Sequence, residues 1–97
     1  MKSIIQPNKD KCFVCGKNSH ADYYGLDEHH VYPGANRKAS EAYGLKVYLC
    51  HDSCHLNGVH QNAELNRSVQ RKVQKIAMAH YGWTLEDWRD RFGRNFL

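Results

Sequence analysis

The sequence predicts a small α+β domain with zinc knuckles and a C-terminal amphipathic helix, and three observations lead to this prediction. The cysteines form two close pairs, at residues 12–15 and 50–54. The run Lys46–Leu49 is rich in strand-forming residues. Residues 62–81 carry apolar side chains at the i, i+4 spacing of a helix that buries one face. Knuckles, a short strand and helices together indicate one compact α+β unit.

The 97 residues have the length of a single domain. We divide it into a metal-site core over residues 12–60 and a helical part over residues 62–97. A chain this short buries a modest core, so packing alone should stabilise it weakly. Fourteen basic against ten acidic residues give a net charge of +4, which is compatible with a nucleic-acid partner without requiring one. We see no signal-peptide pattern and no run of about 20 apolar residues, so we expect a soluble cytoplasmic protein without a membrane partner.

The four cysteines are the strongest motif. In a reducing compartment, pairs at this spacing indicate metal ligands rather than disulfides. Two pairs complete a tetrahedral shell with no open position, which is typical of a structural Zn²⁺ site. Gly16 suits the tight knuckle, where positive φ is needed. Three other interpretations stay open, namely four unrelated buried cysteines, a pair of disulfides, and the exchange of one thiolate for His51 or His55. The expected zinc ligands are Cys12, Cys15, Cys50 and Cys54.

The helical part has clear start and stop signals. Asn62 is a suitable cap for the helix that begins there, and Gly82 can end it. Thr84, with an acid three residues on, predicts the cap of a last short helix. We also expect Val31 and Tyr32 to belong to a strand that faces Lys46–Leu49. The tyrosines, Tyr23 and Tyr24 among them, should fill the core, while His20 should be a surface residue or a core residue with satisfied hydrogen bonds.

Four histidines form a second candidate site. Adjacent strand residues point to opposite faces, so His29 and His30 cannot both face one ion from a regular strand. A bend there would let one bind the ion while the other takes a proton from water, as phosphodiester hydrolysis requires. His55 and His60 are five residues apart, which does not place them on one face of an α-helix. Either a loop intervenes or only one of the two binds metal.

The order of these motifs resembles the HNH (His-Me finger) endonucleases with a treble-clef zinc site, above all their small phage-encoded members. The resemblance is strong over residues 12–60 and weaker elsewhere. It is carried by Cys-x2-Cys, Asp-Glu-His-His-Val-Tyr-Pro-Gly, Val-Tyr-Leu-Cys-x3-Cys-His and Gly-Val-His, with Phe-Gly-Arg-Asn-Phe-Leu at residues 92–97. It implies a ββα-metal domain, in which a hairpin and a helix hold one catalytic divalent cation, Mg²⁺ or another, apart from the zinc.

The resemblance also implies individual roles. His29 would be a ligand of the catalytic ion and His30 the general base. His55 would be the ligand from the helix, with His60 as a second candidate. The family's middle Asn has no counterpart just before Leu49, and Asn36 is the nearest candidate for it. A phage-encoded enzyme would act in the host cytoplasm, with packaging or recombination proteins as further partners.

Basic residues provide candidate DNA contacts. Arg37 and Lys38 flank the site loop, while Arg67 and Arg71 lie one turn apart on the predicted helix. A solvated outer helix face is the simpler interpretation of the second pair. The sequence therefore predicts an endonuclease that hydrolyses DNA phosphodiester bonds with a divalent metal. The alternative is a non-catalytic treble-clef zinc-finger module that binds DNA or a protein.

Overall fold

The structure is a computed structural model that describes residues 2–16 and 25–97. The expectations for His20, Tyr23 and Tyr24 therefore lie outside the described residues. The described part is a small α+β fold, as expected. Its elements are, in chain order, β1 (Leu26–His30), the 3-10 turn η1 (Gly34–Asn36), α1 (Arg37–Tyr43), β2 (Lys46–Cys50), the π-helical segment η2 (His51–Val59), α2 (Ala63–Tyr81) and α3 (Leu85–Phe92).

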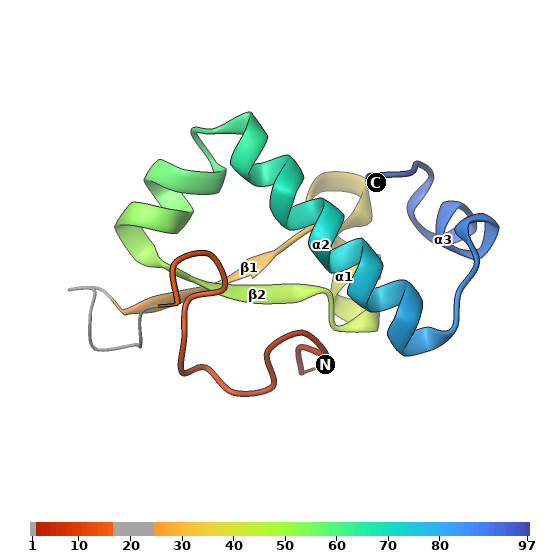
Figure 1. The fold of residues 1–97 in the computed structure, drawn as a ribbon, viewed down its shortest axis with the longest axis horizontal. Coiled ribbons are helices and arrows are strands. Elements are labelled where there is room, and N and C mark those ends of the chain that lie inside the picture. Colours follow the sequence, from red (N-terminus) through yellow and green to blue (C-terminus); the bar gives the residue numbers. More distant parts are fainter. Residues whose placement is uncertain (1, 17–24) are drawn as a thin grey trace.

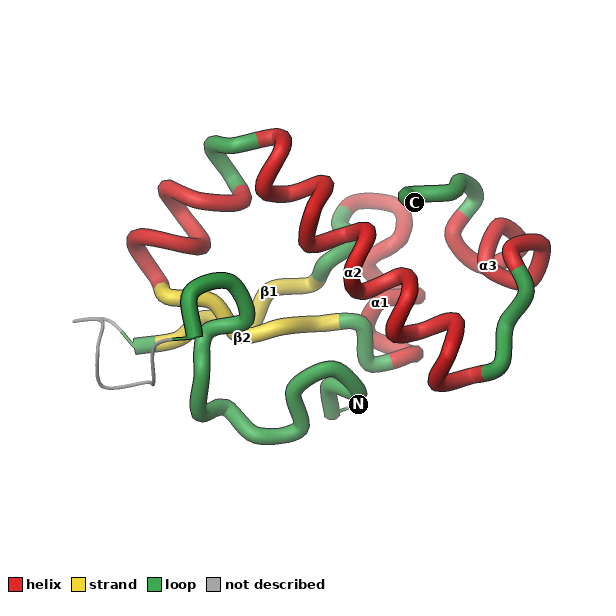
Figure 2. The backbone as a smooth tube through the Cα atoms, viewed as in Figure 1, coloured by secondary structure: helices red, strands yellow, loops and turns green. Residues whose placement is uncertain are grey.

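The strands β1 and β2 form an antiparallel pair in which His29 lies opposite Val47 and His30 opposite Lys46. Figure 1 shows α2 running diagonally across this pair, with α3 beyond its C-terminal end. The buried side chain of Val73 on α2 belongs to the same core as that of Val47 on β2. Because the π-helical segment leads directly from β2 into α2, it lies at the end of the sheet, as the tube in Figure 2 shows.

The two C-terminal helices begin and end as the sequence predicts. The Asn62 side chain accepts a hydrogen bond from the Leu65 N–H, and Gly82 ends α2 at a φ of 68°. Thr84 and Asp87 form a complete capping box at the start of α3. Within the part of the chain that the structure describes, none of the helices combines the length and apolarity that crossing a bilayer requires.

One expectation about the hairpin is wrong in detail, and one helix was not expected. Val31 and Tyr32 follow β1 rather than belonging to it, although the Val31 N–H still donates to Leu45 O at 3.2 Å. The ladder ends there because the chain turns into η1 and then into α1, a helix that the periodicity analysis did not identify. Only two turns long, α1 is too short to show a repeating apolar face.

The N-terminal segment runs along the outer edge of β2 (Figure 1), and backbone bonds join Ile4 to Gly44 and Phe13 to Tyr48. Gly44 is required here, because its φ is 70° and a Cβ atom would lie 2.5 Å from Lys2 O. The segment satisfies backbone groups that an open strand edge would leave unpaired. It also brings the first cysteine pair beside the end of β2.

Candidate functional site

The four cysteines converge on one point, as predicted. Their Sγ atoms all lie within 4.8 Å of one another, and those of Cys15 and Cys50 are 3.5 Å apart. Two thiolates bound to one tetrahedral Zn²⁺ at ~2.3 Å would be about 3.8 Å apart, so the spacing fits such an ion. In the knuckle, the Gly16 N–H donates to Cys12 O at a φ of 76°. The group can therefore hold a metal ion such as zinc; a treble-clef arrangement around it stays a prediction.

The thiols also have the chemistry of a metal site. Burial would raise the pKa of Cys12, but hydrogen bonds from backbone N–H groups outweigh it and lower the pKa to about 7. Burial raises the pKa of Cys50 to about 11, and hydrogen bonds to the neighbouring cysteines add to this rise. Without a cation, the Cys12 thiol therefore ionises readily, whereas the Cys50 thiol does not. A bound cation would stabilise all of them as thiolates.

A separate cluster contains His29, His55 and His60, and we refer to these residues as the three-histidine cluster. One ring nitrogen from each lies within 4.8 Å of the other two. The Nε2 atoms of His55 and His60 are 3.0 Å apart, close to the ~3.3 Å expected for two imidazoles on one tetrahedral ion. His29 is buried at the end of β1, whereas His60 is exposed. The described residues thus supply three ligands and leave one side open to solvent.

The π-helical geometry of η2 explains why His55 and His60 meet. The His60 N–H donates to His55 O at 3.2 Å, an i to i+5 bond that widens the turn. In an α-helix, residues five apart point in different directions, but this wider turn returns His60 to the side of His55. The expected loop is therefore absent, and whether one or both of these histidines bind metal stays a prediction. Gly58 is buried in this turn, with its Cβ position 3.1 Å from Ser53 O.

Asp27 orients His55, one member of the three-histidine cluster, through the ring nitrogen that faces away from the other two histidines. Its Oδ2 atom lies 2.8 Å from Nδ1 of His55 and 2.6 Å from Nδ1 of His51. Burial raises the pKa of Asp27, but the hydrogen bonds from both histidines outweigh this and hold it below its ordinary value. A carboxylate that accepts from Nδ1 keeps the His55 lone pair on Nε2, which faces His60 Nε2 and could bind an ion there. Carboxylate–histidine pairs of this kind are typical of metal sites.

His29 provides an independent sign of a missing partner. Its Nε2 atom is buried and has no hydrogen-bond partner among the described residues. Burial, with repulsion from His55 and His60, lowers the pKa of His29 to about 4, so the ring is neutral near neutral pH. A buried polar atom without a partner costs about 1–3 kcal/mol. A bound cation would remove this cost, and neutral imidazole is the form that binds it.

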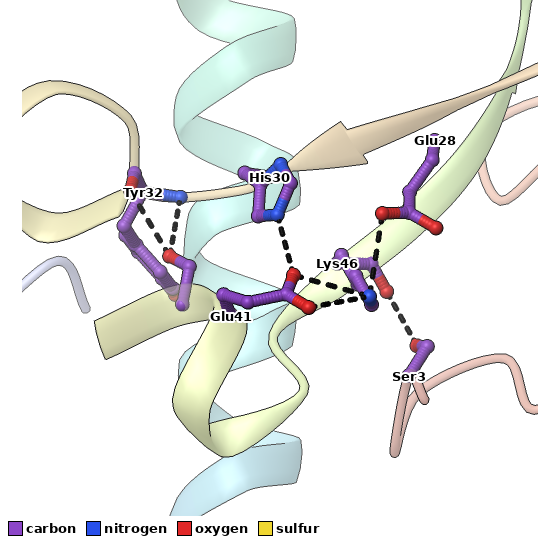
Figure 3. Close-up of polar contacts among 7 residues, drawn as sticks. Ser3, Glu28, His30, Tyr32, Glu41 and Lys46 are labelled. Carbon is purple, nitrogen blue, oxygen red and sulfur yellow. Dashed lines mark hydrogen bonds and ion pairs between the residues drawn. The ribbon is translucent and has the colours of Figure 1, made fainter. Parts of the chain in front are cut away.

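His30 does not join this cluster. It points to the opposite face of β1, where its Nε2 lies 2.7 Å from Glu41 Oε2 on α1 (Figure 3). The bend that would bring His29 and His30 to one ion is absent, because both belong to regular strand through the end of β1. The structure therefore places the predicted ligand and the predicted base on different faces.

The predicted DNA contacts fall into two groups. Arg37 and Lys38 at the start of α1 line an open groove of about 760 Å³ together with His30. Arg67 and Arg71 lie on the exposed side of α2 and do not line it. The first pair is thus placed beside a candidate site residue. The second pair fits the solvated helix face equally well.

Asn36 is tied to the other end of the chain. Its Nδ2 donates to Phe92 O at 3.1 Å, which joins the loop before α1 to the end of α3. It is in neither the groove lining nor the three-histidine cluster. Its contact is that of a residue which holds a loop in shape.

Sequence reasoning missed two carboxylates, and a signal existed for one. Asp27 is two residues before His29, so strand alternation places both on the same face of β1. Glu41 contacts His30 only because α1 folds back against β1, which no local pattern predicts. Comparisons with protein-family models, curated proteins and solved structures find no match to this chain.

Proposed function

We propose that this chain is a divalent-metal-dependent DNA endonuclease of the HNH class, which hydrolyses phosphodiester bonds. The observation that carries the proposal is the convergence of His29, His55 and His60 at a solvent-open point, separate from the four thiols. Three imidazoles with room for water or substrate are the donor set of a catalytic site, whereas four thiolates form a closed structural one. The resemblance to phage-encoded enzymes extends the proposal to packaging or recombination partners in a host cytoplasm.

The buried Nε2 of His29, which has no hydrogen-bond partner among the described residues, supports the proposal that the three-histidine cluster holds a cation. When bound, a divalent ion would supply Lewis acidity, stabilising charge on the phosphate and the leaving oxygen. The protein itself orients the ligands through Asp27 and keeps His29 in the neutral form. On the other face, His30 is proposed to accept the proton of the attacking water.

The groove beside His30 would hold the DNA backbone. Arg37 and Lys38 line it and can bind phosphate oxygens through charge-assisted hydrogen bonds. For both faces to act on one phosphodiester, the phosphate must lie across the end of β1, where His29 and His30 are neighbours. Binding through such contacts should weaken steeply with salt.

A plasmid-nicking assay with the zinc-loaded chain tests the proposal. We expect nicking that depends on added Mg²⁺, Mn²⁺ or Ni²⁺ and falls at least ~100-fold in His55→Ala and in His30→Ala. His80→Ala is the matched control, since this exposed histidine on α2 is remote from both clusters. Absence of divalent-dependent nicking in the unaltered chain would contradict the proposal.

A second candidate function is a zinc module that binds DNA or protein without cutting. The position of His30, away from the three-histidine cluster, favours it, because base and metal then lack a common target. This function predicts two structural metal ions and no cleavage with any divalent cation. In that case, His55→Ala should lower stability, and His30→Ala should leave DNA or protein binding unchanged.

A further inference from the structure

The face of β1 opposite the three-histidine cluster carries a buried lysine between two carboxylates. Lys46 is 6% exposed. Its Nζ lies 3.1 and 3.2 Å from the two Glu41 carboxylate oxygens and 3.3 Å from Glu28 Oε1. Burial would lower the pKa of Lys46, but the two carboxylates outweigh it and raise the pKa. A permanent cation therefore holds both glutamates in place, as Figure 3 shows.

Distances alone would also allow a metal ion at this place, because Glu28, His30 and Glu41 offer three ligand atoms within 4.8 Å. The ammonium group of Lys46 argues against it. It already neutralises one carboxylate charge, and it would repel a divalent cation at close range. We therefore interpret these residues as an ion-pair network that orients a side chain, rather than as a second metal site.

The side chain so oriented is His30. An ionised carboxylate can only accept hydrogen bonds, so the 2.7 Å contact with Glu41 requires a proton on Nε2 of His30. In the neutral ring, the lone pair is then on Nδ1. No group among residues 2–16 and 25–97 bonds this atom, and His30 lines the groove.

We propose that Glu41 is a positioning residue, which fixes the ring of His30 so that Nδ1 is the atom that takes a proton from the attacking water. The inference rests on the proposed function for its chemistry, but not for its geometry. Lys46 acts one step further out, since it fixes the carboxylate of Glu41. In the proposed HNH-type hydrolysis, the carboxylate of Glu41 on α1 thus holds the general base, His30, in the groove that both residues line.

The proposed step balances as follows. The water oxygen forms a bond to phosphorus, the bond from phosphorus to the leaving oxygen breaks, and the water proton moves to Nδ1 of His30. The resulting imidazolium keeps its Nε2 proton, and the Glu41 carboxylate stabilises the positive charge without itself being protonated. The leaving oxygen takes a proton from solvent, and His30 later returns its proton to solvent.

The tautomer of His30 can be measured without any catalysis. Long-range ¹H–¹⁵N spectra of the zinc-loaded chain, recorded where the ring is neutral, should show the proton on Nε2. Glu41→Ala should shift His30 toward a mixture of tautomers. Glu64→Gln is the control, because it removes one negative charge from an exposed position on α2 outside this network, and the tautomer should not change. A proton on Nδ1 in the unaltered chain, or no shift in Glu41→Ala, would overturn the inference.

Kinetics provide a second readout. Glu41→Gln should lower kcat about 10- to 100-fold, part of the ~10²–10⁴ that a positioned base contributes, with the KM for DNA nearly unchanged. Glu41→Asp should restore part of kcat. A rise in KM at constant kcat would show that Glu41 serves only DNA binding and would overturn the positioning role. If the unaltered chain cleaves nothing, the proposed function fails, and the tautomer measurement alone decides on the role of Glu41.

Discussion

The thiols of Cys50 and Cys54 belong to the four-cysteine group. The histidine that follows each of them, His51 or His55, contacts Asp27 instead, and His55 is also part of the three-histidine cluster. One short segment, the end of β2 and the first turn of η2, therefore serves two sites with different chemistry. In the thiol group Cys12, Cys50 and Cys54 are buried while Cys15 is exposed, and the four together could fill a tetrahedral shell. The three-histidine cluster has a buried end at His29 and an open end at His60.

The difference indicates how a small domain can keep a closed site that stabilises the fold apart from an open site that can react. A closed shell gains nothing from solvent and contributes its binding free energy to folding. An open shell holds its ion less tightly but leaves room for water and phosphate. Because both are built on η2, loss of the first should disorder the second, whereas loss of the second should leave the first intact. The predictions below test this asymmetry.

The largest effect is expected from breaking the closed site. Cys50→Ser should cost about 5 kcal/mol or more and leave the chain largely unfolded, because a structural zinc site of this size contributes ~10–16 kcal/mol of binding free energy. Far-UV circular dichroism and bound zinc per chain provide the measurement. A folded Cys50→Ser chain that lacks zinc would show that the core is sufficient by itself.

Breaking the open site should have a more selective effect. His55→Ala should weaken binding of Mn²⁺ or Ni²⁺ to the zinc-loaded chain at least ~100-fold, with thiol-bound zinc and helix content unchanged. Asp27→Asn should weaken it about 10- to 100-fold, since it alters only the orientation of His55. Calorimetric titration measures both, with His80→Ala as the control. Release of the zinc in His55→Ala would contradict the separation of the two sites.

The pH dependence of stability sharpens the comparison. The pKa of His29 falls from 6.5 to about 4 on folding without an ion. As the pH falls, His29 therefore takes up a proton in the unfolded chain before it does so in the folded chain. The stability that the neutral His29 contributes above pH ~6.5 is lost as the pH falls toward 4. The loss is roughly 3 kcal/mol in urea unfolding of the zinc-loaded chain. In His29→Gln this part of the slope should vanish, while any loss from the cysteines remains; an equal slope in both would contradict the role of His29.

The smallest effect is expected outside both sites. Asn36→Ala should cost about 1 kcal/mol, because it removes one hydrogen bond to Phe92 O at the end of α3. Metal binding at both sites and any nicking activity should stay within about twofold. Thermal unfolding and the nicking assay test this prediction. A large loss of nicking at unchanged stability would return Asn36 to the catalytic candidates that the sequence suggested.

Much of the architecture could be predicted because its signals are local. Asn62, Gly82 and Thr84 act on backbone groups within one turn, so their roles follow from the sequence alone. The four-thiol group was equally predictable, since two knuckle-spaced cysteine pairs can satisfy one tetrahedral ion wherever the fold brings them together. In α1, by contrast, seven residues give no periodic signal.

The candidate site shows where local reasoning stops. Strand alternation correctly separated His29 from His30, but it could not say which of them would meet His55 and His60. That pairing depends on the side of β1 against which η2 packs and on an i to i+5 turn that α-helical spacing does not anticipate. Glu41 was beyond reach for the same reason, since its contact with His30 spans a chain reversal.

The sequence by itself determined the caps, the two C-terminal helices and the cysteine pairs that could hold a metal ion, because those depend on residue type and short-range spacing. Only the tertiary structure decided which candidate ligands lie close together, that Asp27 contacts His55, and that Glu41 links Lys46 to His30. The physical reason is distance along the chain. Contacts between residues that are far apart in sequence exist only after β1, β2 and η2 have packed, and no local preference encodes them.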